Sequence, residues 1–256
     1  NQRGLAHFLE HMCFNGTENF PGKTLISYLE SIGVRFGENL NAYTAVDETV
    51  YNIDNVPVIR DGIIDSCLLI LHDWADGLTL DPKEIDNERG LPIGTMEVVD
   101  NFPHQALRDY YEKWYRPDQQ GIMIVGDIDV DKVEAKIKEI FSPIKMPENP
   151  AERKYFPVPD NKEAIVTIAK DKEQTNTIIY LWHKHDIVPN EAKKNMDYLV
   201  MNYMKSMINN MLNARLNELK ETPQPPFIYA VTEDGNFFLS KTKDAFTGIA
   251  VSKEDG

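Results

Sequence analysis

A proline-rich stretch near the middle of the chain limits what this sequence can fold into. Five prolines fall within "SPIKMPENPAERKYFPVPDNKE" (142–163), which holds few hydrophobic runs. Such a composition is typical of a linker, because proline interrupts helices and central strands. We therefore expect a domain boundary near 145–162, with one domain at 1–147 and a second at 160–256.

The spacing of apolar residues predicts helices and strands on both sides of this boundary. Asp81 and Pro82 have the residue types of a helix N-terminus, and Asp129 is expected to cap the helix that follows it. The Met-rich run 196–212 has helical spacing and is expected to pack in a core. Expected helices cover 5–13, 21–33, 58–77, 81–90, 103–116, 129–140 and 190–220. Expected strands lie within 34–56 and at 121–128, 164–169 and 176–183, with three short strands near the end. The fold class is α+β, with two similar domains that each pack helices on an antiparallel-rich sheet.

Charge and composition exclude several classes of partner. The 256 residues carry a formal net charge of −14, which argues against a nucleic-acid partner and against an anionic membrane surface. No apolar run approaches the roughly 18 residues that a membrane span needs. Cys13 and Cys67 lie in apolar, helix-like contexts, so we expect two buried free thiols rather than a disulfide.

The stretch "HFLEH" (7–11) carries the strongest chemical signal. His7 and His11 are four residues apart, so on a helix both imidazoles project from one face, as two ligands of a tetrahedral zinc ion require. Glu10 flanks the same face and could act as general base toward a metal-bound water. The alternative is a surface helix with two solvated histidines. The added glutamate and the apolar opposite face favour a metal site.

Longer blocks of the sequence resemble the pitrilysin–insulysin family, the inverted zincins that include mitochondrial processing peptidases. The blocks are "RGLAHFLEHMCFNGTENFPG", "GENLNAYTAVDETVYNID", "NERG", "PIGTMEVV" and "LRDYYEKWYRPDQQGIMIVGDID", and they stretch from residue 3 to about 129. The resemblance implies the N-terminal half of a bacterial-type zinc endopeptidase or oligopeptidase. It also implies Zn²⁺ as cofactor, with His7 and His11 as ligands and Glu10 as general base.

The same resemblance implies how substrate and partner would bind. Asn41, Ala42 and Tyr43 are expected on an edge strand that lines the cleft and pairs with an extended peptide. The alternative is a covered strand in which Tyr43 and Tyr51 only pack. A C-terminal half of the same protein or a homologous subunit, in a possible dimer, is expected to close over the cleft. The expected compartment is a bacterial periplasm or cytoplasm.

The third zinc ligand does not carry over from the family. Glu88 maps to a glutamate that supports the site, and the ligand that follows seven residues later would map to Thr95. One explanation is that residues are missing between Gly90 and Leu91; it is favoured because Pro92 would break the preceding helix at once. The other is a catalytically inactive relative that serves as a scaffold or peptide-binding subunit. Glu88 as the third ligand itself is a weaker alternative. We also expect that the chain is part of a longer protein.

The remaining histidines have simpler interpretations. His72 and His104 stand alone on predicted helices, and we expect local carboxylates or the surface to be their partners. His183 and His185 are two apart on a predicted strand, where a solvated pair is favoured over a second metal site.

Overall fold

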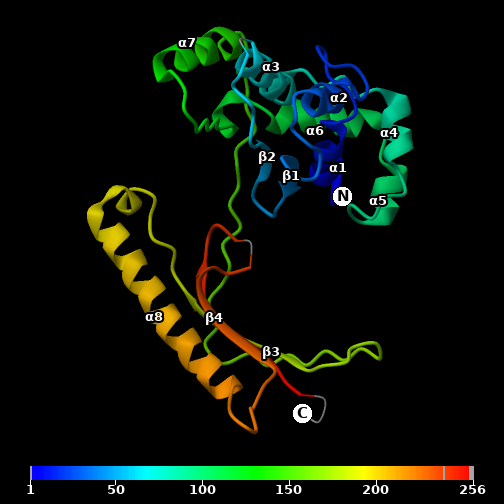
Figure 1. Ribbon diagram of the computed structural model, residues 1–256. Coiled ribbons are helices and arrows are strands. Elements are labelled where there is room, and N and C mark those ends of the chain that lie inside the picture. The colour runs from blue at the N-terminus through cyan, green and yellow to red at the C-terminus, as the bar shows by residue number, and fades with distance from the viewer. Residues whose placement is uncertain (1, 61, 239, 254–256) are drawn as a thin grey trace. The chain divides into compact units, whose positions relative to one another are not determined.

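The computed structural model describes residues 2–60, 62–238 and 240–253. The chain divides into two compact units, 1–153 and 154–256 (Figure 1). The division falls inside the proline-rich stretch, and each unit is described by itself below.

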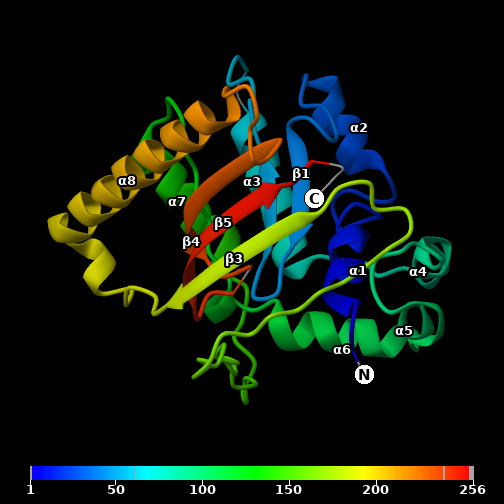
Figure 2. The ribbon, with the colours of Figure 1, turned by 90° about the horizontal axis from the view of Figure 1, so that it is seen from below.

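The first unit packs helices around one short hairpin. Its strands β1 (Leu40–Thr44) and β2 (Thr49–Ile53) pair in antiparallel register, with Leu40 opposite Ile53 and Thr44 opposite Thr49. The helices are α1 (Leu5–Met12), α2 (Thr24–Ser31), α3 (Ile63–Asp76), α4 (Pro82–Glu88), α5 (Met96–Asn101), α6 (His104–Trp114) and α7 (Val130–Phe141), and a 3-10 turn η1 covers Pro117–Gln119. Helix α1 contacts the hairpin as well as α4 and α6 (Figure 2).

The core of the first unit holds α1 in place. The side chains of Phe8 and Leu9 are fully buried, in a cluster that also contains Leu107 from α6. A second cluster joins α2, β1 and α3 through Leu29, Leu40, Ile70 and Trp74. Burying a side chain of this size stabilises the fold by about 1.5–3 kcal/mol. The helix that carries the two histidines is therefore fixed by packing on its apolar face.

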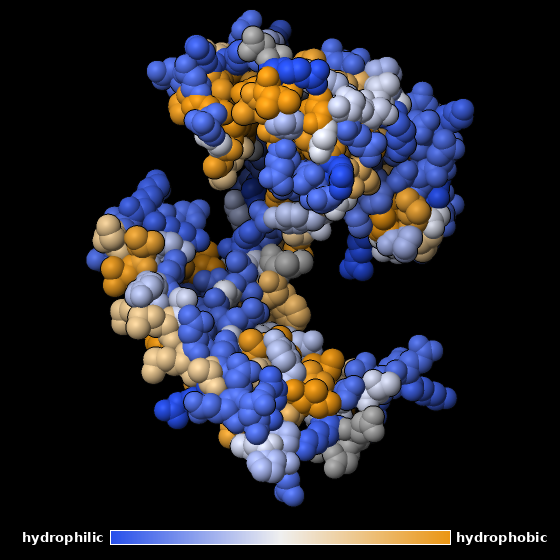
Figure 3. All heavy atoms as spheres, in the orientation of Figure 1, coloured by the Kyte–Doolittle hydropathy of each residue, from blue (hydrophilic) through white to orange (hydrophobic). Residues whose placement is uncertain are grey.

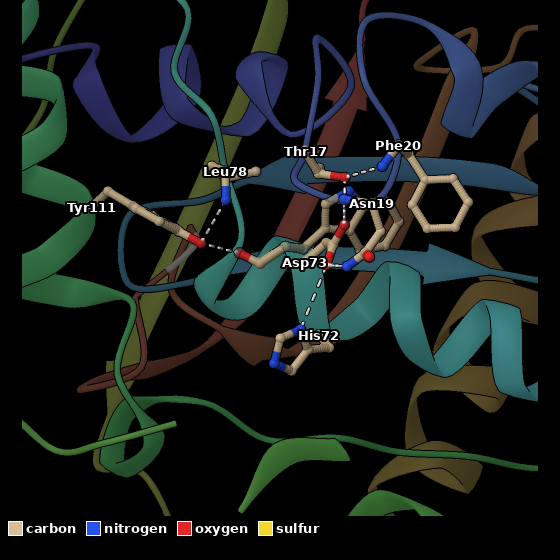
Figure 4. A network of polar contacts seen from close by, with 8 residues as sticks. Thr17, Asn19, Phe20, His72, Asp73, Leu78 and Tyr111 are labelled. Atoms are coloured by element: carbon tan, nitrogen blue, oxygen red, sulfur yellow. Dashed lines mark hydrogen bonds and ion pairs between the residues drawn. The ribbon is translucent and has the colours of Figure 1, made fainter. Parts of the chain in front are cut away.

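A buried carboxylate fixes the turn that follows α1. Asp73 on α3 is fully buried and accepts hydrogen bonds from Thr17 Oγ1 (2.6 Å), from Asn19 N (2.9 Å) and from Asn19 Nδ2 (2.8 Å) (Figure 4). The hydroxyl of Tyr111 donates to the carbonyl oxygen of Trp74 at 3.1 Å and thereby joins α6 to α3. A buried carboxylate is tolerated only when its oxygens are hydrogen-bonded, and three donors meet them here.

The second unit consists of one long helix and a three-stranded antiparallel sheet. The elements are β3 (Ile178–His185), a 3-10 turn η2 (Ala192–Lys194), α8 (Met196–Lys220), β4 (Tyr229–Asn236) and β5 (Asp244–Val251), and the strand order is β3-β5-β4. Asn213 joins α8 to β4, because its side chain accepts from Thr232 N at 2.7 Å and donates to Thr232 O at 2.9 Å.

The mixed helix-and-sheet class is confirmed, and each predicted helix forms, in most cases over a shorter range. Asp81 caps α4 by accepting from Lys83 N at 2.8 Å, and Asp129 caps α7 by accepting from Lys132 N at 3.2 Å. Both cysteines are free thiols; Cys13 is buried and Cys67 is half-buried. In the part of the chain that the structure covers, no helix is both long enough and apolar enough to cross a bilayer.

Three predictions about local structure are wrong. Neither 121–128 nor 164–169 forms a strand, and Met123 and Val125 are each 88% exposed. A strand needs a neighbour for its backbone groups, and the described sheet of the first unit consists of β1 and β2 alone. Among the residues described after α8, two strands rather than three are found.

The Met-rich run does not form a core. Met204, Met207 and Met211 are exposed on α8, and Figure 3 shows apolar side chains gathered over this helix. Among the second unit's described residues, Ala245 is the one buried apolar side chain, so α8 finds few neighbours to cover it.

Candidate metal centre

Helix α1 places His7 and His11 side by side on one face. Their ring centroids lie 5.0 Å apart at an interplanar angle of 70°, and both rings are half-buried. The helix begins after Gly4, whose φ of 103° lies in the left-handed region. Gly4 packs directly on Gly94, since a Cβ on Gly94 would meet the Gly4 Cα at 2.5 Å. The segment 91–95 is thus seated on the first turn of this helix.

Glu10 is buried and held by the hairpin. Its Oε2 accepts a hydrogen bond from Thr44 Oγ1 at 2.5 Å, and Thr44 Oγ1 lies 3.2 Å from Thr49 Oγ1 across the strand pair. The side chain is 6% exposed, so water competes little with the threonine donor. No sequence pattern identified Thr44 as part of the site. Its contact with Glu10 spans 34 residues and leaves no local pattern.

Glu88 is the residue that meets His11. Its Oε1 lies 2.7 Å from His11 Nδ1, and its Oε2 accepts from Asn15 Nδ2 at 3.0 Å. The ammonium group of Lys23 donates to Asn15 Oδ1. No sequence pattern identified Asn15 or Lys23 as part of the site, although Asn15 lies only three residues after the end of the histidine helix.

The pKa values of this pair move in opposite directions. The hydrogen bond with Glu88 raises the pKa of His11, against a smaller opposing effect of burial. The hydrogen bond with His11 lowers the pKa of Glu88, again against burial. When neutral His11 donates its Nδ1 proton to Glu88, its Nε2 keeps the lone pair. A carboxylate placed in this way fixes the tautomer of a metal-binding histidine.

The donor set fits zinc in part. His7 and His11 are two nitrogen donors on one face, but a catalytic zinc site uses three protein ligands. Across the described ranges, no group of three or more His, Cys, Asp and Glu side chains could hold a metal ion. Thr95, the position to which the third ligand maps, is the N-cap of α5. Helix α4 ends at Glu88, and Gly90 has a φ of 85°, so Thr95 does not lie two turns along that helix.

The three predicted substrate-binding residues lie on β1. Asn41 and Ala42 are half-buried, and Tyr43 is exposed, with its hydroxyl 3.4 Å from Glu48 Oε1. Within the described residues β1 pairs with β2 only, so one edge of β1 has no strand neighbour. The structure therefore brings the histidines, Glu10 and Glu88 together and leaves this strand beside them.

A cavity of about 420 Å³ lies beside β2 in the first unit. Its lining combines Ala6 of α1 with the edge of β2 and a group of aromatic side chains, Tyr51, Trp74, Tyr110, Trp114, Tyr115 and Phe141. Tyr51 OH lies 2.5 Å from Tyr115 OH and accepts from Cys13 Sγ at 3.2 Å. Burial raises the pKa of Cys13 to about 12, which favours the protonated thiol.

Three of the other four histidines have a carboxylate neighbour. His104 Nε2 lies 2.8 Å from Asp86 Oδ1, and His72 Nδ1 lies 3.5 Å from Asp73 Oδ1, as predicted. In the second unit His185 Nε2 lies 3.2 Å from Asp234 Oδ2.

Two family models match the chain. Residues 1–127 match the model described as Insulinase (Peptidase family M16), and residues 101–222 match the model described as Peptidase M16 inactive domain.

Individual relatives agree with these matches. "Probable zinc protease PqqL" of Escherichia coli is 31% identical over 257 residues, which covers 86% of this chain and 27% of that protein. The crystal structure of the first half of the periplasmic protease PqqL from Escherichia coli superposes with a TM-score of 0.78 at 27% identity, over 99% of this chain and 60% of that one. Cytochrome b-c1 complex subunit 1 of Rattus norvegicus is 31% identical over 107 residues, which covers 42% of this chain and 21% of that protein.

The Escherichia coli relative is much longer than this chain, and the aligned stretch contains residues that this chain lacks. The chain spans about a quarter of the Escherichia coli relative. The matched stretch of 257 residues is longer than the 86% of this chain that it covers, so the relative has residues for which this chain has no counterpart.

Proposed function

The chain belongs to the insulinase family of peptidases, family M16, and on that basis we propose that it is part of a zinc-dependent endopeptidase or oligopeptidase that hydrolyses peptides or unfolded polypeptides. A relative that is named a zinc protease supports this proposal. The observation that carries it is the grouping of His7, His11 and Glu10 on α1 with Glu88 2.7 Å from His11.

Each residue of the proposed site has a distinct task. His7 and His11 would hold the zinc ion through ring nitrogens. Bound zinc supplies Lewis-acid chemistry, which lowers the pKa of a coordinated water toward about 7. Glu10 would accept the proton of the attacking water and later return it to the leaving amine. Thr44 holds the Glu10 carboxylate in one orientation during these steps, and Glu88 holds the imidazole of His11.

Substrate is proposed to bind along β1. An extended peptide that pairs with a strand edge gains main-chain hydrogen bonds whatever its side chains are, as a peptidase of broad specificity requires. Asn41, Ala42 and Tyr43 would hold the substrate backbone beside Glu10. Residues 1–147 would form the catalytic-type domain and 160–256 a second, non-catalytic domain of the same kind. A C-terminal half of the protein or a homologous subunit would cover the cleft.

The proposal requires a third zinc ligand, and we assign it to residues encoded between Gly90 and Leu91. The Escherichia coli relative has residues without a counterpart here, which supports this assignment. The test is to sequence the gene across this junction, produce the encoded protein, and measure bound zinc and peptide cleavage. A glutamate seven residues after Glu88, one zinc per chain and cleavage are expected. A continuous gene and a product without cleavage would contradict the proposal.

A second candidate is a non-catalytic subunit that binds peptides or serves as a scaffold. Two observations favour it: no third ligand is found among the described residues, and a cytochrome b-c1 complex subunit is among the relatives. This candidate predicts peptide binding without cleavage, with a continuous gene at the junction. The two candidates therefore differ in both measurements.

A further inference from the structure

Asn15 occupies a buried position between α1 and α4. It follows the end of α1, its backbone N–H donates to Met12 O at 3.0 Å, and its side chain is 4% exposed. Both ends of its amide are used, because Nδ2 donates to Glu88 Oε2 at 3.0 Å and Oδ1 accepts from Lys23 Nζ. A buried amide with both ends bonded has one orientation.

This orientation determines how Glu88 presents its carboxylate. Glu88 has one oxygen against His11 and the other against Asn15. With two donors on two oxygens, rotation of the carboxylate breaks at least one hydrogen bond. Without the Asn15 donor, Oε2 would lose its partner and the carboxylate could turn away from His11.

The position of Asn15 is itself fixed by the core. The turn that follows it is bonded to the buried Asp73 through Thr17 and Asn19 (Figure 4). The turn also packs closely at Gly16, whose φ is 122° and where a Cβ would lie 3.1 Å from Gly22 N. These contacts hold the turn, and with it Asn15, in place against α3.

We propose that Asn15 is a positioning residue of the candidate metal centre, which holds Glu88 so that His11 keeps its proton on Nδ1 and its lone pair on Nε2. Lys23 assists by fixing which end of the Asn15 amide faces Glu88. The role of Asn15 in zinc binding rests on the proposed function. The hydrogen bonds from Lys23 through Asn15 and Glu88 to His11 form without a metal.

Only an amide satisfies both neighbours at this position. Aspartate would place a second carboxylate against Glu88 and repel it. Alanine would leave Glu88 Oε2 without its donor. An acceptor without a donor destabilises the protein more in a half-buried site than at the surface, because water replaces the donor less readily.

The test uses the full chain in metal-free form and the variants Asn15→Ala and Asn101→Ala. Asn101 is the matched control, since its exposed amide donates to Glu97 O in its own helix and makes no contact with the candidate metal centre among the described residues. ¹⁵N NMR of the imidazoles reports the tautomer. A single Nδ1–H form of His11 is expected in the parent and in Asn101→Ala, and a mixture with the Nε2–H form is expected in Asn15→Ala. Zinc affinity, measured by competition with a chelator, should fall about tenfold in Asn15→Ala alone.

A double-mutant comparison separates positioning from a general structural role. In a Glu88→Gln background, Asn15→Ala should cause no further change in the His11 tautomer or in zinc affinity. An unchanged His11 tautomer in a folded Asn15→Ala protein would overturn the proposal. If Asn15→Ala does not fold, Lys23→Met replaces it, because Lys23 is exposed, and an unchanged tautomer there would equally overturn the proposal. A parent protein without peptidase activity but with the expected tautomers would contradict the proposed function and leave this inference standing.

Discussion

Glu88 lies 77 residues after His11 in the sequence, and its Oε1 is 2.7 Å from the Nδ1 of that histidine. The last residue of α4 therefore lies against the last turn of α1, the helix that carries both histidines. The contact joins two helices that pack through separate residues, Leu9 on α1 and Ile85 on α4, in one core cluster. The polar pair thus depends on apolar packing for its alignment.

Glu10→Gln is expected to abolish peptide hydrolysis and to leave zinc binding intact. Glutamine keeps the size of the side chain and can still accept from Thr44, but it cannot take up a proton. General-base catalysis contributes about 10²–10⁴-fold, so a loss of at least that size is expected in cleavage of a fluorogenic peptide. Glu84→Gln, on α4, is the control. Undiminished hydrolysis in Glu10→Gln would contradict the general-base role.

Thr44→Val is expected to lower kcat more than it changes KM. The valine has a similar shape but removes the donor that lies 2.5 Å from Glu10 Oε2. Loss of a donor to a buried carboxylate lowers the free energy of unfolding by about 1–3 kcal/mol, which chemical denaturation can measure. Thr49→Val is the matched control, because Thr49 contacts Thr44 and not Glu10. Equal effects of both variants would show that the hairpin, rather than the donor, matters.

Asp73→Ala is expected to destabilise the first unit by about 3 kcal/mol or more. The substitution leaves the buried hydroxyl of Thr17 without its acceptor and removes the hydrogen bonds that hold Asn19 to α3. Asp65→Asn, at the start of α3, removes a solvent-exposed ion pair with Lys136 and should change stability by less than about 1 kcal/mol. Urea denaturation of the full chain compares the two. Similar midpoints for both variants would contradict the role of Asp73.

The pair of His11 and Glu88 should stabilise the metal-free protein most between about pH 4.5 and 6.5. The pKa of His11 is raised above its ordinary 6.5, so its contribution is complete below that value and is lost as the pH rises through the raised pKa. The pKa of Glu88 is lowered below its ordinary 4.5, so its contribution is present above that value and is lost as the pH falls through the lowered pKa. The difference in melting temperature between the parent and Glu88→Gln should be largest inside this window. A difference that does not vary with pH would show that the pair is not ionic.

Chelation of zinc is expected to stop hydrolysis without unfolding the first unit. The apolar face of α1 is buried by Phe8, Leu9 and Met12, and this packing does not depend on a metal. Circular dichroism and peptide cleavage should be followed together as chelator is added and as zinc is restored. Loss of helical signal in parallel with activity would instead indicate a zinc-stabilised interaction domain.

The sequence predicted those parts of the site that lie within one helix. The spacing of His7 and His11, the apolar face of α1 and the cap at Asp81 follow from local periodicity and residue type. The donors Thr44 and Asn15 could not be predicted in this way, because each meets its carboxylate across a long stretch of chain. In the segment 121–128, a local pattern predicted a structure that does not form. Its apolar composition is typical of a buried strand, yet strand formation depends on a neighbour, which no pattern within the segment supplies.

The contact between Gly4 and Gly94 has a consequence for the junction at Gly90. On one side of this junction, the guanidinium group of Arg89 donates hydrogen bonds to Val99 O and Phe102 O, each at 2.7 Å. On the other side, Gly94 packs against Gly4 at the start of α1. The two ends of any extra segment encoded there would be anchored already. Such a segment would leave and re-enter the fold at fixed points, and each doubling of its length would cost only about 0.6 kcal/mol in closure entropy. The first unit can therefore gain or lose an inserted segment at this junction, together with any zinc ligand in that segment, while the packing of its helices stays the same.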